Sequence, residues 1–146
     1  MSIADRTTRT IWEGPLASGE GTLSQGSSGA LDGLQATWAS RTEQPSGKTS
    51  PEELAAAAHS SCFAMALALK LGENDTPPQR LDVQSTVTLD AVDGVPTITT
   101  SRLAVRATVA GLDADAFAAV VEEAAALCPV SRLFAGAKIS VDAQLV

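Results

Sequence analysis

The segment from Ser50 to Leu71, SPEELAAAAHSSCFAMALALKL, constrains the fold of this chain more than any other part of it. Ser50 has the position of a helix N-cap, Pro51 suits the first helical position, and Glu53 completes a capping box with Ser50. Ala, Leu, Met and Phe fill most of the remaining positions, so the predicted helix is apolar almost all round. We expect it to be buried at the centre of the fold, with Cys62 as an interior thiol.

Length and composition limit the classes of protein to which the chain can belong. Its 146 residues fit a single domain, residues 1–146, that buries roughly two-thirds of its unfolded surface. A net charge of −7 without a Lys/Arg cluster argues against nucleic acid or an anionic membrane as partner. Residues 1–10 lack the apolar stretch of a secretory signal, and the polar side chains within the apolar helix argue against a membrane span, which together predict a cytoplasmic protein. One His and two Cys match no zinc or CxxC spacing, so no metal is expected.

The residues before the helix have the pattern of short strands. Between Thr8 and Ser40, stretches of strand-forming residues alternate with Gly/Ser turns, which predicts three antiparallel strands. Trp12 and Trp38 are the expected apolar anchors of this part of the core. The loop RTEQPSGKT follows, with Arg41 at the end of the last strand.

After the helix the hydrophobic period changes to two. Residues 81–89 and 103–109 alternate between apolar and polar side chains on either side of a turn at 92–96, which predicts a long β-hairpin. Asp113 should cap a second helix that ends near Leu127, and a last strand should follow a turn at Gly136. The order βββ-α-ββ-α-β favours an α+β fold with antiparallel sheets and a buried central helix.

The two cysteines are the first candidates for chemistry. Pro129 disfavours helical geometry at Cys128 and suits the start of a new helix, so Cys128 should stand at a helix break where N–H groups lower the pKa of its thiol. Burial should raise the pKa of Cys62 and leave it inert unless a cation offsets the effect. On spacing alone, Cys128 is therefore the better candidate for an exposed thiolate.

Other interpretations of the polar residues stay open at this point. His59 lies one turn before Cys62, so a Cys-His pair for acyl transfer or hydrolysis is conceivable, as is a histidine with a purely structural role. Arg41 and Glu52 alone would pass for a surface arginine and a solvated acid of the first helical turn. A non-enzymatic binding protein with inert thiols is a third hypothesis.

Several short motifs occur together along nearly the whole chain: WEGPL, GEGTLS, PEEL, HSSCF, TLDAVDG and CPVS. In this combination the chain resembles the OsmC/Ohr family of thiol-dependent peroxidases, the osmotically inducible protein C and organic hydroperoxide resistance proteins. TWASR and AAHSSCFAMAL are closer to the OsmC branch. The resemblance implies an OsmC-like fold, an intertwined homodimer, and a peroxidase without metal or cofactor.

The resemblance also implies residue roles. Cys62 matches the peroxidatic cysteine and Cys128 the resolving cysteine, while Arg41 and Glu52 match the family's arginine and glutamate. The set is chemically coherent, because a buried thiolate needs a guanidinium to lower its pKa and a buried arginine needs a carboxylate. Peroxide would oxidise Cys62 to a sulfenic acid, which Cys128 would convert into a Cys62–Cys128 disulfide. Apolar walls would favour an organic hydroperoxide over hydrogen peroxide, and the family suggests a dithiol reductant of the lipoyl type.

The spacing of Glu52 and Cys62 bears on the oligomeric state. Ten residues on one straight helix separate them by about 15 Å along its axis, more than one arginine can comfortably bridge. Either the helix breaks after its first turn, or Arg41 and Glu52 reach the cysteine of a partner chain. The helix-forming residues Ala55 to Ala58 argue against a break, and the all-round apolar helix requires additional cover. Both observations favour a homodimer with sites at its interface.

Overall fold

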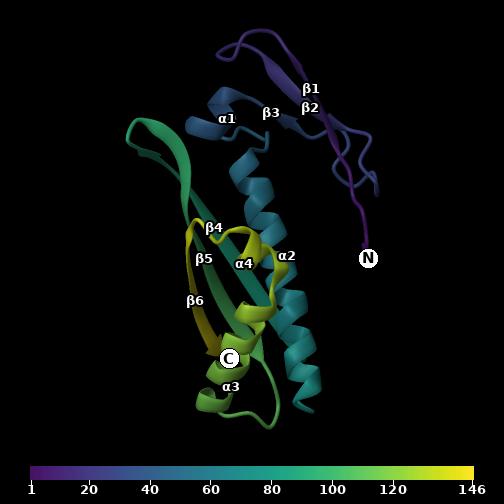
Figure 1. Ribbon diagram of the computed structural model, residues 1–146, viewed down its shortest axis with the longest axis vertical. Helices are drawn as coiled ribbons and strands as arrows, with labels where there is room; N and C mark the ends of the chain where they lie inside the picture. The colour runs from purple at the N-terminus through teal and green to yellow at the C-terminus, as the bar shows by residue number, and fades with distance from the viewer. The chain divides into compact units, whose positions relative to one another are not determined.

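The computed structural model describes residues 1–146 as two compact units, residues 1–54 and 55–146 (Figure 1). The first unit contains β1 (Arg9–Glu13), β2 (Glu20–Ser24), β3 (Gln35–Ala36), α1 (Trp38–Thr42) and the start of α2 (Pro51–Glu73). The second unit contains the rest of α2 and, in chain order, β4 (Arg80–Val92), β5 (Val95–Thr108), α3 (Ala114–Leu127), α4 (Pro129–Leu133) and β6 (Lys138–Leu145). The predicted α+β class is confirmed, with two short helices added to the predicted order.

The first unit holds an antiparallel sheet in the order β1-β2-β3. Its last strand is shorter than predicted, because α1 begins directly after Thr37. The Ser40 N–H donates to the Thr37 hydroxyl (3.0 Å) and the Thr37 N–H donates to the Ser40 hydroxyl (2.9 Å), which forms a capping box. Arg41 therefore belongs to a short helix, and the prediction that it ends a strand is wrong.

The expectation that Trp12 anchors the core is also wrong. Its side chain lies on β1, whose residues are all exposed, and is itself 42% exposed. Its indole N–H donates to the Gly14 carbonyl (2.8 Å), so the polar end of the ring is satisfied by the turn after the strand. Trp38 is half-buried on α1.

Helix α2 begins as predicted and continues without a break. The Glu53 N–H donates to the Ser50 hydroxyl (3.1 Å), which confirms Ser50 as cap, but the Glu53 carboxylate accepts from the Thr49 hydroxyl (2.9 Å) instead of returning to Ser50. The helix is continuous from Pro51 to Glu73, so the alternative of a break after its first turn is excluded.

One face of α2 packs into the second unit and the opposite face is open. Phe63, Leu67 and Leu71 are fully buried, whereas Met65 is 72% and Leu69 52% exposed. The expectation of burial all round is therefore wrong for the single chain. The helix is long and apolar enough to cross a membrane by length and composition alone, and one of its faces packs into the core of the second unit.

The sheet of the second unit has the order β4-β5-β6. Strands β4 and β5 form the predicted hairpin, closed by Asp93 and Gly94 with φ values of 52° and 79°, as a two-residue turn requires. Strand β6 pairs parallel to β5, so the prediction of wholly antiparallel sheets is wrong for this pair. The parallel pairing follows from the crossover through α3 and α4, which returns the chain to the same end of the sheet.

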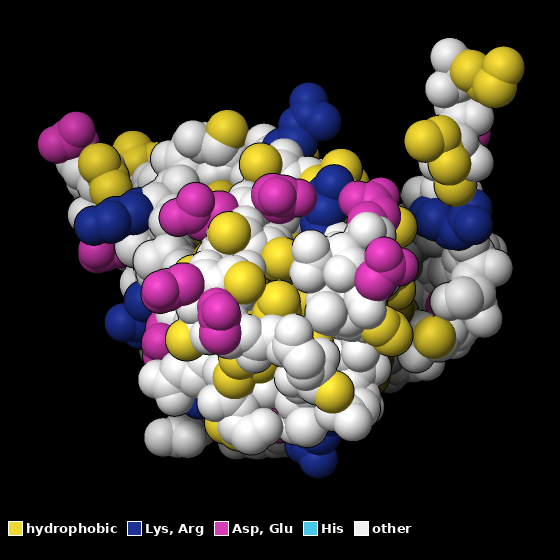
Figure 2. Space-filling model, turned by 90° about the horizontal axis from the view of Figure 1, so that it is seen from below, with side chains coloured by type: hydrophobic (Ala, Val, Ile, Leu, Met, Phe, Trp, Pro, Cys, Tyr) yellow, Lys and Arg dark blue, Asp and Glu magenta, His cyan; other side chains and the backbone are white.

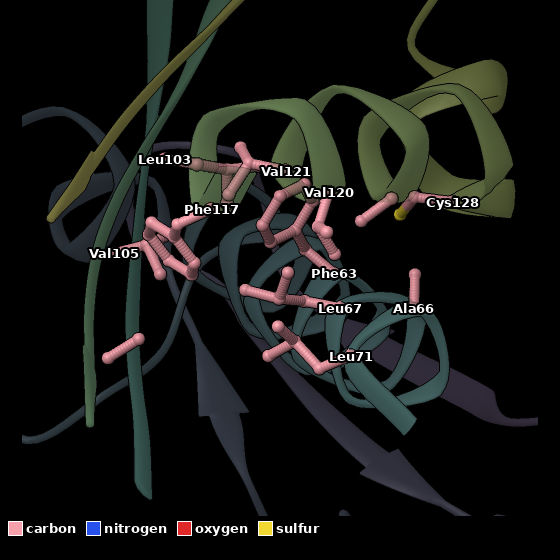
Figure 3. Close-up of a cluster of buried hydrophobic side chains, with 12 residues drawn as sticks. Phe63, Ala66, Leu67, Leu71, Leu103, Val105, Phe117, Val120, Val121 and Cys128 are labelled. Atoms are coloured by element: carbon pink, nitrogen blue, oxygen red, sulfur yellow. The ribbon is translucent and has the colours of Figure 1, made fainter. Parts of the chain in front are cut away.

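The main core lies where α2, β5 and α3 meet (Figure 3). Helix α3 starts as predicted, with the Ala116 N–H donating to the Asp113 carboxylate (2.8 Å). The buried side chains that converge in Figure 3 come from all three elements: Phe63, Ala66, Leu67, Leu71, Leu103, Val105, Phe117, Val120 and Val121.

On the surface shown in Figure 2, acidic side chains are spread over the face and no broad basic patch is present.

Replacing Phe117 by Ala is expected to lower the free energy of unfolding by about 3–5 kcal/mol, since the ring is 2% exposed and its loss leaves a cavity between α3 and β5. The matched control on the same helix is Glu122→Ala, an exposed side chain whose loss should change that energy by no more than about 0.5 kcal/mol. Urea unfolding at one fixed protein concentration measures both. Equal effects of the two substitutions would contradict this description of the core.

Candidate active site

The two cysteines lie side by side in the second unit. Cys62 is half-buried near the middle of α2, and Cys128 is fully buried at the junction of α3 and α4. Their Sγ atoms are 3.3 Å apart. As predicted, Cys128 marks a helix break: its N–H closes α3 on the Ala124 carbonyl (2.9 Å), and Pro129 opens α4. A disulfide between the two requires an approach of little more than about 1 Å.

The surroundings shift the two thiols in opposite directions. Burial raises the pKa of Cys62, and the adjacent Cys128 raises it further against the opposing effect of the Val130 N–H. Burial alone would raise the pKa of Cys128 too, but hydrogen bonding from the hydroxyl and N–H of Ser131, from Cys62 and from the Val130 N–H lowers it below its ordinary value. Of the pair within this unit, Cys128 is thus the thiol that ionises first.

The surface next to Cys62 is a shallow apolar groove of about 330 Å³. It is formed by the open face of α2 and the end of α3, and its lining residues are Cys62, Met65, Ala66, Leu69, Leu127 and Pro129. No charged side chain belongs to this lining. The groove therefore suits the hydrocarbon part of a small ligand, with a thiol at its edge.

Arg41 and Glu52 form a bidentate ion pair in the first unit. The Arg41 Nε donates to both carboxylate oxygens of Glu52 (3.0 and 3.1 Å), and a terminal nitrogen donates to one of them (2.7 Å). The guanidinium also lies 6.0 Å from the centre of the Trp38 ring, which is cation–π range. Glu52 is nearly buried, so the pair fixes the position of a cation that retains 29% side-chain exposure.

A second apolar groove, of about 340 Å³, adjoins this ion pair in the same unit. Arg41 is the only charged residue in its lining, which otherwise includes Trp12, Leu16, Trp38 and Leu54. A cation at the wall of an apolar groove suits a ligand with one polar and one hydrocarbon end.

His59 is not arranged as the partner of Cys62. Its side chain is fully buried, its Nδ1 lies 2.6 Å from the Ser101 hydroxyl and its Nε2 lies 2.8 Å from the Ser131 hydroxyl. Both ring nitrogens are thus already paired with serines. The Cys62–His59 nucleophilic pair considered for acyl transfer is excluded by this geometry.

The four residues predicted for the site form two pairs, each within one unit: Cys62 with Cys128, and Arg41 with Glu52. Sequence reasoning missed Ser101 and Ser131, the partners of His59. The CPVS motif holds the only local signal, because a serine three residues after Cys128 can reach back to it at the start of a helix. No group of three or more His, Cys, Asp or Glu side chains could hold a metal ion.

An α+β framework that holds a half-buried and a buried thiol at 3.3 Å defines a two-cysteine thiol protein. Comparison with known proteins identifies its family: the model of the OsmC-like proteins matches residues 44–143, and the chain belongs to this family. It is 42% identical to peroxiredoxin OsmC of Escherichia coli K12 over 92% of both chains, and equally similar to peroxiredoxin OsmC of Shigella flexneri. The prediction of a peroxidase-class oxidoreductase is confirmed by these relatives.

Solved structures show the same fold. The organic hydroperoxide resistance protein OhrB of Bacillus subtilis superposes with a TM-score of 0.70 at 25% identity, covering 96% of this chain and 98% of that one. An OsmC-like protein of Mycoplasma pneumoniae reaches a TM-score of 0.76 at 12% identity, with 99% of each chain covered. The OsmC-like fold expected from the resemblance is therefore confirmed.

Proposed function

We propose that this chain reduces organic hydroperoxides to alcohols with Cys62 as the peroxidatic thiol and Cys128 as the resolving thiol. The observation that carries the proposal is the 3.3 Å separation of the two sulfurs, with Cys62 alone facing an apolar groove. Peroxiredoxin OsmC and the organic hydroperoxide resistance protein are the relatives that support this substrate class.

In the first step the Cys62 thiolate attacks the distal oxygen of the hydroperoxide. The O–O bond breaks, the sulfur is oxidised to a sulfenic acid, and the departing alkoxide takes up a proton and leaves as the alcohol. The hydrocarbon group of the substrate packs in the apolar groove, for which hydrogen peroxide has no equivalent group. Hydrogen peroxide is therefore the poorer substrate.

In the second step the Cys128 sulfur attacks the sulfenic sulfur. A Cys62–Cys128 disulfide forms, and the sulfenic hydroxyl leaves with one proton as water. A dithiol of the lipoyl type then reduces the disulfide and is itself oxidised to its cyclic disulfide. The reaction requires no bound cofactor or metal, and it takes place in the cytoplasm, where such reductants keep thiols reduced.

Arg41 is the group that makes Cys62 reactive. Burial and Cys128 raise the pKa of the Cys62 thiol within the second unit, so the thiolate needs an added cation. The guanidinium of Arg41, held by Glu52, supplies a full charge, whereas the start of α4 supplies only partial charges. The same guanidinium donates hydrogen bonds to the peroxide oxygens and stabilises the alkoxide.

The functional unit is a homodimer in which the two units of each chain work together as one OsmC-like domain. Because α2 is unbroken, Glu52 and Cys62 are separated by about 15 Å along its axis. The Arg41–Glu52 pair that serves Cys62 therefore comes from the partner chain. The exposed apolar face of α2, with Met65 and Leu69, is the surface that a second copy covers.

Mixing Glu52→Ala subunits with Cys62→Ser subunits is expected to restore activity that neither variant has alone. With equal mixing, half of the dimers are mixed and each has one complete site of two, so about a quarter of the wild-type activity should return. The control mixes Cys62→Ser with the double variant Glu52→Ala/Cys62→Ser, which offers no complete site. No recovery in verified mixed dimers would contradict the shared site.

Steady-state turnover tests the proposed function itself. With dihydrolipoamide as reductant, cumene hydroperoxide should be consumed with a higher kcat/KM than hydrogen peroxide, and with one cumyl alcohol formed for each dithiol oxidised. No turnover with dihydrolipoamide or dithiothreitol would refute the proposal. Unreactive thiols would then favour the non-enzymatic binding protein.

A further inference from the structure

His59 is a fully buried polar side chain that the proposed reaction does not use. It extends from α2, and hydroxyl groups from two other elements pair with its ring nitrogens. Nδ1 lies 2.6 Å from the hydroxyl of Ser101 on β5, and Nε2 lies 2.8 Å from the hydroxyl of Ser131 on α4. The ring of Phe134, the residue directly after α4, stands edge-on to the imidazole with ring centres 5.3 Å apart. The imidazole therefore links α2 to the sheet through one nitrogen and to α4 through the other.

Helix α4 depends on this contact for its position. It is a single turn of five residues, too short to be stable on its own. Its one buried side chain is Ser131, whereas Leu133 is 76% exposed and Val130 is only partly buried against the core. Removing the serine hydroxyl would leave a buried ring nitrogen of His59 without a partner, which is costly. The hydrogen bond therefore fixes α4 more firmly than the apolar side chains of this helix do.

The two helices that this contact joins also hold the two cysteines. On α2, His59 precedes Cys62 by three residues, which places both on one face of the helix. On α4, Ser131 follows Cys128 by three residues, and Cys128 is the N-cap from which this helix starts. Two contacts therefore bridge α2 and α4 about one helical turn apart: the histidine–serine hydrogen bond at 2.8 Å and the pair of sulfur atoms at 3.3 Å.

Disulfide formation is sensitive to the position of Cys128. Its sulfur must approach the sulfenic sulfur of Cys62 opposite the departing hydroxyl, and a misplacement of about 1 Å slows such a step on the order of 10²-fold. The N–H of Cys128 donates to the Ala124 carbonyl of α3 (2.9 Å), and its carbonyl accepts from the Arg132 N–H of α4 (3.1 Å). A displacement of α4 therefore displaces one of the two backbone attachments of this cysteine.

We propose that His59 is a positioning residue for disulfide formation: its hydrogen bond to Ser131 holds α4 against α2 and keeps Cys128 within reach of Cys62. This inference rests on the proposed function, in which Cys128 is the resolving thiol. The imidazole does not touch the reacting atoms and takes no part in the transfer of oxygen or of a proton. Its effect is therefore confined to the second chemical step, after the sulfenic acid has formed.

The sulfenic acid of Cys62 has two competing fates, and their ratio reports the position of Cys128. In one, the Cys128 sulfur attacks, the disulfide forms and the hydroxyl leaves as water. In the other, a second hydroperoxide transfers an oxygen to the sulfur, which yields a sulfinic acid and a second alcohol. A displaced Cys128 slows the first reaction and leaves the second unchanged. The sulfinic fraction at a given peroxide concentration should therefore rise when the hydrogen bond to α4 is lost.

Two amide substitutions of His59 separate the two contacts of its ring. The side-chain nitrogen of glutamine lies near the position of Nε2 and that of asparagine near the position of Nδ1, so His59→Gln keeps the contact with Ser131 and His59→Asn only that with Ser101. After one equivalent of cumene hydroperoxide, rapid quenching with dimedone and mass spectrometry follow the sulfenic acid and the disulfide over time. His59→Asn should form the sulfenic acid at the wild-type rate and close the disulfide about 10–10²-fold more slowly. His59→Gln should close it at close to the wild-type rate.

Ser131→Ala and Ser101→Ala form the matched pair on the other side of the ring. Each removes one buried hydroxyl from the imidazole, so both should lower the free energy of unfolding. Only Ser131→Ala should slow disulfide closure and raise the sulfinic fraction. The double variant His59→Asn/Ser131→Ala should be no slower than the slower single variant, because both changes break the same contact. The serine variants decide the question if the histidine variants do not fold.

The outcomes separate the inference from the function on which it rests. If the wild type forms neither sulfenic acid nor disulfide, the proposed function fails. If the wild type forms both, and folded His59→Asn and Ser131→Ala close the disulfide at the wild-type rate, only the positioning role fails. Equal slowing by Ser131→Ala and Ser101→Ala would also overturn this role, because a general loosening of the core would then explain the effect.

Discussion

Replacing Cys62 by Ser should lower peroxidase turnover by roughly 10³-fold or more, because no other group of the site can take the oxygen. Cys62 is the thiol that faces the apolar groove, whereas the sulfur of Cys128 is enclosed. The substitution is nearly isosteric and the site is half-buried, so the fold should be retained. Stopped-flow consumption of cumene hydroperoxide measures the effect.

Cys128→Ser is the matched comparison for this experiment. It should also abolish dithiol-dependent turnover, but it should still consume one equivalent of peroxide for each subunit in a rapid first phase. Cys62→Ser should show no such phase. A full first phase in Cys62→Ser would contradict the assignment of the attacking thiol.

Replacing Arg41 by Ala should lower kcat/KM by about 10²–10³-fold, since it removes both the cation beside the thiolate and a donor to the departing oxygen. The sign of the pKa change follows from the charge: a nearby cation favours the thiolate, so its loss returns the pKa of Cys62 to the raised value that burial and Cys128 give it within a single chain. In the neutral range the rate of the variant should then rise about tenfold with each pH unit, whereas the wild-type rate should level off at lower pH.

Arg41→Lys tests charge against geometry. It keeps the cation but not the bidentate contact with Glu52. Compared with Arg41→Ala, it should therefore bring the pKa of Cys62 most of the way back down to the wild-type value, but it should recover only part of the wild-type rate. Iodoacetamide reactivity of Cys62 against pH, in a Cys128→Ser background, measures the thiol pKa directly. The same pKa and rate in Arg41→Ala and in the wild type would refute the role of Arg41.

The parts of the fold that were predicted from the sequence are those that local signals specify. Ser50 and Pro51 mark the start of α2, Asp113 marks the start of α3, and Pro129 marks the helix break at Cys128. Each signal acts within four residues of the structure that it defines, so no knowledge of the remaining chain is needed.

The parts of the fold that were missed depend on contacts between residues distant in sequence, or on local sequence patterns that fit more than one structure. Thr37 and Ser40 form the capping box of α1, but they follow a strand-like segment and precede only one turn of helix. The parallel pairing of β6 with β5 depends on the path of the intervening helices, which alternation of side chains does not encode. The open face of α2 has the same composition as its buried face, so periodicity could not distinguish them.

In the candidate site, too, local spacing predicted some features and could not predict contacts between residues distant in sequence. The proximity of Cys62 and Cys128 joins residues 66 positions apart and was expected only from the family resemblance. His59 was recognised as a possible partner of Cys62 because they share a helix face, but Ser101 and Ser131, 42 and 72 positions away, occupy its ring instead. Local spacing placed the histidine correctly and could not identify its contacts.

The most direct test of the account is to find the sulfur that receives the peroxide oxygen. Reduced Cys128→Ser is treated with one equivalent of cumene hydroperoxide, trapped with dimedone, digested and analysed by mass spectrometry, with Cys62→Ser treated in parallel. We predict the sulfenic acid adduct on Cys62 of the first variant and no adduct on Cys128 of the second. An adduct on Cys128 in Cys62→Ser, with Cys62 unmodified in Cys128→Ser, would reverse the two roles and contradict the account.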